Sequence, residues 1–378
     1  MNTTKREKKA KESNEETPIL DGKISPIGQI ESFFKDTEGY YGSVYEHVDN
    51  GFETDIKIPT GSYKLDMHLD GGYNAGSMSM FVGDRESGKT AQGLLWGKNW
   101  QDHFEEKGWV VFYDAEGRLT EKKIRMSGID KDRLIVVKSN AAEFVLQNIQ
   151  NQINANPNGF KYFFIVDSIN ALTTGDERGK TLDEAEARAG VARVTSMSFK
   201  KLSLPIHVKG HHLYICSQIR AGNMTGFGGA GNKAGGGKAP EFYGDLIAHM
   251  GQAWEKNAPK LIKDGETIIG RYTEIDFRKS YNEVTGSKLA IPVKYNHVGG
   301  VWKANEIVDM ALEWGLVLKG GSWFNIQGEL FKDSAEKAGI NTDLLSKKVQ
   351  GHFGFVGFLE ENPDLAQLIY RYILELIK

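Results

Sequence analysis

The sequence has little of several features that define large protein classes. It contains one cysteine, Cys216, so no disulfide bond can form within the chain, and this is typical of a reducing cytoplasm. It also lacks an apolar run of membrane-spanning length and a hydrophobic signal-peptide core near its start. We therefore expect a soluble, cytoplasmic protein with no membrane partner, in which Cys216 is a buried strand residue rather than a nucleophile.

The sequence also has little excess charge of either sign, because 47 lysines and arginines nearly balance 50 aspartates and glutamates, for a formal net charge of -3. No global positive field therefore attracts nucleic acid, and any DNA binding has to come from local patches. The nine histidines show no metal-ligand spacing, since His211 and His212 are adjacent rather than on one helical face. A histidine-based metal site is therefore not indicated.

The overall composition is that of a globular protein, with 40% hydrophobic and 26% charged residues, and the length suits a core domain with smaller additions. Residues 1–22 are polar and are expected to form a disordered tail. Residues 23–50 contain a short helical pattern whose apolar stripe needs a covering partner, so we interpret them as an N-terminal oligomerisation helix. Residues 51–298 are expected to form the core, and 299–378 a small α+β C-terminal domain that ends in the helix 364–378.

Strands and helices alternate through the core. Four short apolar runs predict strands, and three amphipathic segments predict helices between them. The strands are 78–82, 109–113, 162–166 and 212–216, and the helices are 91–106, 142–155 and 184–203. This alternation predicts the α/β class, with a mainly parallel sheet flanked by helices, followed by a hairpin of 273–282 and 288–295.

A glycine-rich motif follows the first predicted strand. The sequence from Gly83 to Thr90 matches G-x-x-x-x-G-K-[ST] at every fixed position, between an apolar strand and an amphipathic helix. Its backbone N–H groups would surround phosphates, Lys89 would reach the β and γ phosphates, and the Thr90 hydroxyl would bind Mg²⁺. The predicted ATP-binding residues are Gly83, Asp84, Arg85, Glu86, Ser87, Gly88, Lys89 and Thr90. The alternative is a glycine-rich turn without a ligand.

The other three predicted strands also end in polar residues. They run into Asp114-Ala115-Glu116, Asp167-Ser168 and Ser217-Gln218. Because ligands of open α/β sheets bind at the carboxyl ends of the strands, we expect Asp167 to hold Mg²⁺ through water, Glu116 to activate the attacking water and Gln218 to sense the γ-phosphate. The alternatives are a helix cap, a solvated surface acid and a loop amide, respectively. Asp114 is expected to be structural.

Two segments of the core are candidate DNA-binding loops. In 220–240 glycine is abundant, and basic and aromatic side chains could contact phosphates and stack on bases. The predicted contacts there are Arg220, Phe227, Lys233, Gly236, Gly237 and Lys238. This segment starts two residues after Gln218, so ATP binding could order it; the alternative is a flexible linker. The second candidate, 173–190, leads into a helix with Arg193 and Lys200, for which the alternative is a solvated helix face.

Several motifs together resemble the RecA/UvsX family of ATP-dependent DNA recombinases. They are Pro59-Thr60-Gly61-Ser62, the P-loop, Phe112-Tyr113-Asp114-Ala115-Glu116, Ile165-Val166-Asp167-Ser168, Ser217-Gln218-Ile219-Arg220 and Lys279-Ser280. The resemblance runs from about residue 28 to the C-terminus. It implies a P-loop NTPase core of the RecA type, ATP and Mg²⁺ as cofactors, and DNA-stimulated ATP hydrolysis.

The resemblance also implies a reaction and partners. The protein would polymerise with itself into a helical filament on single-stranded DNA and promote homologous pairing and strand exchange with double-stranded DNA. Single-strand-binding proteins and loader proteins are further implied partners, and the implied location is nucleoid-associated. The alternatives are a ring helicase of the same ATPase superfamily and a recombination mediator that uses ATP as a switch.

Two positions depart from the family pattern. Lys123 stands where the family has an aromatic residue that stacks on adenine, and Tyr281 stands where it has the second of two lysines. The first lysine, Lys279, shares a strand face with Phe277, which is a costly place for an unpaired charge. We hypothesise that Lys279 contacts the γ-phosphate held by the next subunit, in the manner of an arginine finger; the alternative is a salt bridge within one subunit. Arg278, on the opposite face, is expected to pair with an acidic neighbour.

Overall fold

The computed structural model describes residues 19–20, 23–24, 56–178, 189–219, 242–256 and 258–377. The chain divides into two compact units, residues 1–52 and 53–378. In the first unit, β1 (Ile19–Leu20) pairs antiparallel with β2 (Lys23–Ile24), so this pair spans the predicted boundary between residues 22 and 23. The remainder of the predicted tail and the predicted oligomerisation helix lie outside the described residues.

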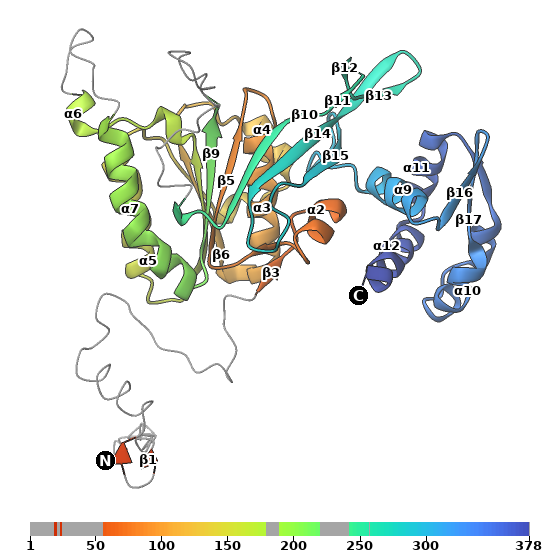
Figure 1. Ribbon diagram of the computed structural model, residues 1–378, viewed down its shortest axis with the longest axis horizontal. Coiled ribbons are helices and arrows are strands. Elements are labelled where there is room, and N and C mark those ends of the chain that lie inside the picture. Colours follow the sequence, from red (N-terminus) through yellow and green to blue (C-terminus); the bar gives the residue numbers. More distant parts are fainter. Residues whose placement is uncertain are drawn as a thin grey trace, which may run out of the picture. The chain divides into compact units, whose positions relative to one another are not determined.

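A nine-stranded sheet forms the centre of the second unit (Figure 1). Its parallel strands are β5 (Ser77–Gly83), β6 (Gly108–Asp114), β7 (Leu134–Val137), β8 (Lys161–Asp167), β9 (His212–Gln218) and β10 (Leu246–Gln252). Antiparallel strands β13 (Leu261–Asp264), β14 (Thr267–Lys279) and β15 (Lys288–Lys294) extend it beyond β10. The order is β13-β14-β10-β5-β9-β8-β6-β7, with β15 paired to β14. The prediction of a mainly parallel α/β sheet is confirmed.

Helices cover both faces of this sheet, because its central strands are apolar on both sides. On one face, α3 (Lys89–Phe104) and α4 (Glu121–Ser127) lie over a core that contains Trp96, Trp100 and Tyr214. On the other face, α5 (Ala142–Asn154) and α7 (Ala189–Val208) pack on a second core. Figure 1 shows α5 and α7 together on the side of the sheet away from α3. Cys216 is fully buried on its strand, as predicted.

Several elements differ from their predicted bounds. Neither β7, which has only four residues, nor β10, which includes the polar residues His249 and Gln252, was predicted from the sequence. The helix α7 continues past Ser203 to Val208 with Pro205 inside it. Pro205 lies in the last turn of the helix, and its carbonyl accepts the Lys209 N–H at 3.1 Å.

The C-terminal part has a hydrophobic core of its own. It is built from α9 (Lys303–Glu313), β16 (Val317–Gly320), β17 (Trp323–Ile326), α10 (Gly328–Lys337), β18 (Lys348–Gln350), α11 (His352–Glu361) and α12 (Pro363–Ile377). This agrees with the predicted α+β composition and terminal helix. The same core also includes Ile262 of β13 and packs against Ile269 and Tyr272 of β14. The boundary at residue 299 therefore stays a prediction.

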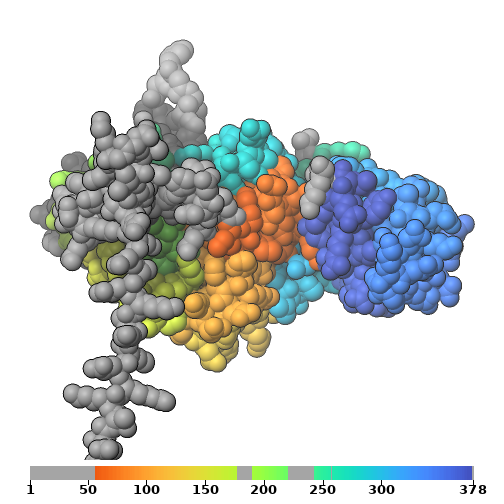
Figure 2. All heavy atoms as spheres, turned by 90° about the horizontal axis from the view of Figure 1, so that it is seen from below, coloured from red at the N-terminus to blue at the C-terminus, as the bar shows by residue number. Residues whose placement is uncertain are grey.

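Short elements complete the second unit. They are β3 (Lys57–Ile58), which pairs with β4 (Tyr73–Asn74), α2 (Tyr63–His68), α6 (Gly175–Arg178), and the pair β11 (Trp254–Glu255) and β12 (Ala258–Pro259). The helix α2 contacts α9, and Figure 2 shows the blue C-terminal residues against the orange segment that contains α2.

A buried carboxyl group joins α2 to α9. Glu306 is fully buried and accepts hydrogen bonds from the Ser62 hydroxyl at 2.5 Å and the Tyr63 N–H at 2.8 Å. Burial raises the pKa of Glu306 from 4.5 to about 8, although both hydrogen bonds act in the opposite direction. Nearby, burial also raises the pKa of Asp66, to about 6. This junction therefore retains protons that water-exposed carboxyl groups would release.

We expect this junction to make the folded state less stable as the pH rises. Above pH 4.5 the unfolded chain loses the Glu306 proton that the native state keeps until about pH 8, so the free energy of unfolding should fall between these values. Glu306→Gln should remove most of this dependence of the free energy of unfolding on pH, and Asp66 should account for the remainder. Urea unfolding at several pH values tests this, with Glu313→Gln, an exposed position of the same helix, as control. An unchanged slope in Glu306→Gln would refute the assignment.

Candidate nucleotide-binding site

The predicted P-loop connects β5 to α3 at the carboxyl edge of the sheet. β5 ends at Gly83 and α3 begins at Lys89. A Cβ atom on Gly83 would lie 2.1 Å from the Met250 carbonyl oxygen, and Gly88 has a φ of +105°, so both positions require glycine. The loop therefore has the backbone freedom, and the helix N-terminus beneath it, that phosphate binding needs.

Lys89 lies folded into this loop. Its ammonium group donates to the carbonyl oxygens of Gly83 and Asp84, both at 2.8 Å, and to the Ser87 hydroxyl at 3.1 Å. Burial lowers the pKa of Lys89, and the carboxylates of Asp167, Asp84 and Glu116 act in the opposite direction. A buried ammonium held only by neutral oxygens is well placed to contact an anion.

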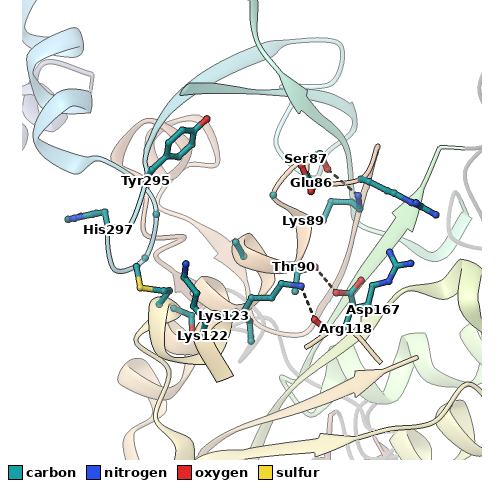
Figure 3. Close-up of a pocket in the computed structure, with 18 of the residues that line it drawn as sticks. Glu86, Ser87, Lys89, Thr90, Arg118, Lys122, Lys123, Asp167, Tyr295 and His297 are labelled. Atoms are coloured by element: carbon teal, nitrogen blue, oxygen red, sulfur yellow. Dashed lines mark hydrogen bonds between the residues drawn. The ribbon is translucent and has the colours of Figure 1, made fainter. Parts of the chain in front are cut away.

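Thr90 and Asp167, the two residues predicted to hold Mg²⁺, lie in contact. The Thr90 hydroxyl donates to the Asp167 carboxylate at 2.6 Å, across the space between α3 and the end of β8 (Figure 3). Burial is the main reason why the pKa of Asp167 is raised; the Thr90 hydrogen bond and the Lys89 charge oppose it. A hydroxyl and a carboxylate converging beside Lys89 are hard oxygen ligands of the kind that Mg²⁺ prefers, so the residues present fit a nucleotide-bound magnesium ion.

Glu116 is the centre of a hydrogen-bond network between three strand ends. Its Oε1 accepts from the Ser168 hydroxyl and from the Gln218 amide, both at 2.6 Å. Its Oε2 lies 3.2 Å from the guanidinium of Arg118. The sequence placed Glu116 and Gln218 at the same edge of the sheet, but not in contact with each other, and it did not single out Arg118.

Asp114 has the structural role that the sequence predicted. Its two carboxylate oxygens accept the backbone N–H groups of Arg118 at 2.9 Å and Leu119 at 3.1 Å. Asp114 therefore fixes the turn after β6 that carries Glu116.

A cavity of about 790 Å³ opens in front of these groups (Figure 3). One wall holds the P-loop with Glu116, Asp167 and Gln218. The opposite wall comes from α4 and the segment after β15, and the sequence analysis missed all of it except Lys123. It includes Lys122, Lys123, Met126, Tyr295, Asn296, His297, Gly299 and Gly300. Its sequence signals were Lys123, at the family's adenine-stacking position, and the polar, glycine-containing stretch that follows the predicted hairpin.

Lys279 does not line this cavity. Its ammonium donates to the Phe242 carbonyl at 3.2 Å. Burial raises the pKa of Asp245, and the charge of Lys279 is among the effects that oppose this rise. Arg278 lies 2.7 Å from Asp276, so the prediction that it pairs with an acidic neighbour is confirmed.

Two of the predicted DNA contacts can be placed. Arg193 and Lys200 are both exposed on α7. The other predicted contacts, Arg220, Phe227, Lys233, Gly236, Gly237 and Lys238, lie outside the described residues, as does most of the 173–190 segment.

Comparison with known proteins agrees with this geometry. The family model of the RecA N-terminal domain matches residues 28–303, most of the chain. The chain belongs to the RecA family. The predicted resemblance is thereby confirmed for the family as a whole.

Curated RecA-family relatives cover nearly the same length. Protein RecA of Acidothermus cellulolyticus is 27% identical over 319 residues, covering 84% of this chain and 83% of the relative. Protein RecA of Bifidobacterium breve is 28% identical over 342 residues, covering 86% and 82%. Protein RecA of Mycobacteroides abscessus is 26% identical over 335 residues, covering 88% and 87%.

Membership of the RecA family makes this chain a RecA-type recombinase or ATPase in the broad sense, with nucleotide binding, DNA binding and self-association as family properties. In the part of the chain that the structure describes, each helix is too short or too polar to span a lipid bilayer.

Proposed function

We propose that this protein is an ATP-dependent homologous recombinase, with DNA-stimulated ATP hydrolysis driving turnover of a filament on single-stranded DNA. The observation that carries the proposal is the 2.6 Å hydrogen bond between Gln218 and Glu116. Gln218 ends β9, and the glycine-rich segment 220–240 follows directly. The proposed hydrolytic base, Glu116, thus contacts Gln218, which lies two residues before the proposed DNA-binding loop.

In the proposed reaction, ATP lies in the cavity with its phosphates at the P-loop. Lys89 turns from the loop carbonyls to the β and γ phosphates, and Thr90 and Asp167 are the residues that would hold magnesium. The ion, when bound, neutralises phosphate charge. Glu116 accepts a proton from water, whose oxygen attacks the γ-phosphorus while the bond to ADP breaks. Gln218 couples the presence of the γ-phosphate at this site to the 220–240 segment.

The second wall of the cavity supports a proposal for the nucleobase. Lys123 stands at a position that is aromatic in the family, whereas Tyr295 and His297 bring rings to the same wall of the cavity. We propose that the base lies between α4 and the segment 294–300, with Tyr295 supplying the aromatic surface.

The proposed partners are single-stranded DNA, double-stranded DNA, further copies of the chain in a helical filament, and single-strand-binding and loader proteins, in the cytoplasm with the nucleoid. Exposed Arg193 and Lys200 on α7 and the basic residues of 220–240 would contact phosphates, so binding should weaken steeply with salt.

Deleting residues 228–236 tests the proposed DNA loop. DNA-stimulated hydrolysis should disappear while hydrolysis without DNA stays, because the deletion leaves Gln218 and the P-loop in place. Phe227→Ala alone should weaken single-strand binding by about 1–3 kcal/mol if the ring stacks on a base. Fluorescence anisotropy with a labelled oligonucleotide measures the affinity. DNA affinity equal to that of the full chain after the deletion would show that the segment is only a linker.

We further propose that Lys279 acts in trans on the γ-phosphate of the neighbouring subunit. It is partly exposed, lies outside its own cavity and is held by a carbonyl oxygen at 3.2 Å, a bond that a phosphate could replace. Lys279→Ala and Glu116→Gln subunits should each be inactive alone, but mixtures should regain part of the DNA-dependent hydrolysis at interfaces where both groups are intact. Filaments that form without any recovery, at every mixing ratio, would exclude the trans role.

A further inference from the structure

The turn after β6 places a cation on the proposed hydrolytic base. Arg118 lies 3.2 Å from Glu116 Oε2, which receives neither the Ser168 nor the Gln218 hydrogen bond. The Glu116 side chain is 16% exposed, whereas that of Arg118 is 58% exposed and lines the cavity (Figure 3). The guanidinium therefore occupies the one carboxylate oxygen of Glu116 that an attacking water could use.

The backbone of Arg118 is fixed although its side chain is not. Its N–H is held by Asp114 at 2.9 Å, and its carbonyl oxygen accepts the Lys123 ammonium at 2.9 Å. Because the guanidinium is 58% exposed, water can replace Glu116 as its partner, so it can leave the carboxylate at little cost. The long side chain can thus change partner while the turn stays in place.

We propose that Arg118 senses the terminal phosphate of ATP, by changing partner from the Glu116 carboxylate to the γ-phosphate; this inference rests on the proposed function. The planar guanidinium matches the geometry of phosphate oxygens, and a terminal phosphate carries more charge than one carboxylate. Its departure frees Glu116 Oε2 to take the proton of the attacking water. ADP has no γ-phosphate, so with ADP the guanidinium stays on Glu116 and the base remains covered.

Two other cations of the cavity are hydrogen-bonded to oxygens other than those of Glu116. Lys123 donates to the Arg118 carbonyl oxygen, and Lys89 donates to the carbonyl oxygens of Gly83 and Asp84. In the part of the chain that the structure describes, the cation that forms an ion pair with Glu116 is Arg118. Arg118 was not predicted as a site residue because an arginine in a turn has the sequence pattern of a solvated surface residue.

The test compares the affinities for ADP and for a slowly hydrolysed ATP analogue by isothermal titration calorimetry, in full-length Arg118→Ala, Arg118→Lys and wild-type protein. Arg118→Ala should bind the ATP analogue about tenfold more weakly, the loss of roughly one charge-assisted hydrogen bond, while ADP affinity stays within about twofold. Arg118→Lys should recover about half of the loss on a logarithmic scale, because it restores the charge without the planar fork. Arg125→Ala, an exposed arginine of α4 outside the cavity, is the control.

Equal weakening for both nucleotides would mean that Arg118 only supports the turn, and no weakening for either would mean that its pair with Glu116 is incidental. Both results overturn the inference. A wild-type protein that binds neither nucleotide would instead contradict the proposed function itself.

Discussion

Lys89→Ala is expected to lose tight nucleotide binding. The wild-type ammonium makes three hydrogen bonds within the P-loop, to Gly83, Asp84 and Ser87, and in the proposed complex it exchanges the carbonyl oxygens for phosphate oxygens. Hydrogen bonds to a charged group are worth about 1.5–3 kcal/mol each, so losing two of them should weaken ATP binding by about a hundredfold or more. Equilibrium binding of a fluorescent nucleotide analogue measures this loss.

The matched control is Lys98→Ala, on the same helix. Lys98 pairs with Asp102 at the helix surface and does not line the cavity, so its loss should leave nucleotide affinity unchanged. Circular dichroism should show that both variants are folded. Wild-type affinity in a folded Lys89→Ala protein would mean that nucleotide does not bind at this loop.

Glu116→Gln should have an effect of a different kind. The amide keeps an oxygen that accepts hydrogen bonds but cannot take a proton from water, and the loss of a general base costs about 10²–10⁴-fold in turnover. Nucleotide affinity should persist, since Glu116 is not part of the phosphate-binding loop. Filaments on DNA should last longer, because hydrolysis is proposed to release subunits. Steady-state phosphate release and filament lifetime are the two measurements.

Glu121→Gln, an exposed acid at the start of α4, is the control for this substitution, and its turnover should equal that of the wild type. If Glu116→Gln also kept wild-type turnover, another carboxylate would be the base. Asp114 is a poor substitute, because both of its oxygens are occupied by backbone N–H groups.

The sequence could predict the strands that surround the site because each is an apolar run with a sharp polar end. Such runs have to be buried on both faces, and parallel strands bring their ends to one edge. The meeting of Thr90 with Asp167 follows from that arrangement alone. The contact between Gln218 and Glu116 does not, since it depends on side-chain conformations that a motif leaves open.

The second wall of the cavity could not be predicted for a different reason. Tyr295 and His297 follow an antiparallel strand, and their approach to α4 depends on how β14 and β15 extend the sheet beyond β10. That arrangement is set by pairing between strands that are distant in the sequence, and the hydrophobic periodicity of each strand does not predict this pairing. β7 was missed because a four-residue edge strand with two exposed residues has no clear pattern.

The most direct test of the proposed recombinase is electron microscopy of the full chain with single-stranded DNA and a slowly hydrolysed ATP analogue. We expect continuous helical filaments on the DNA, and none when Lys89→Ala replaces the wild type. Six-fold rings would contradict the proposal in favour of a helicase, and isolated particles that bind nucleotide without assembling on DNA would contradict it in favour of a mediator.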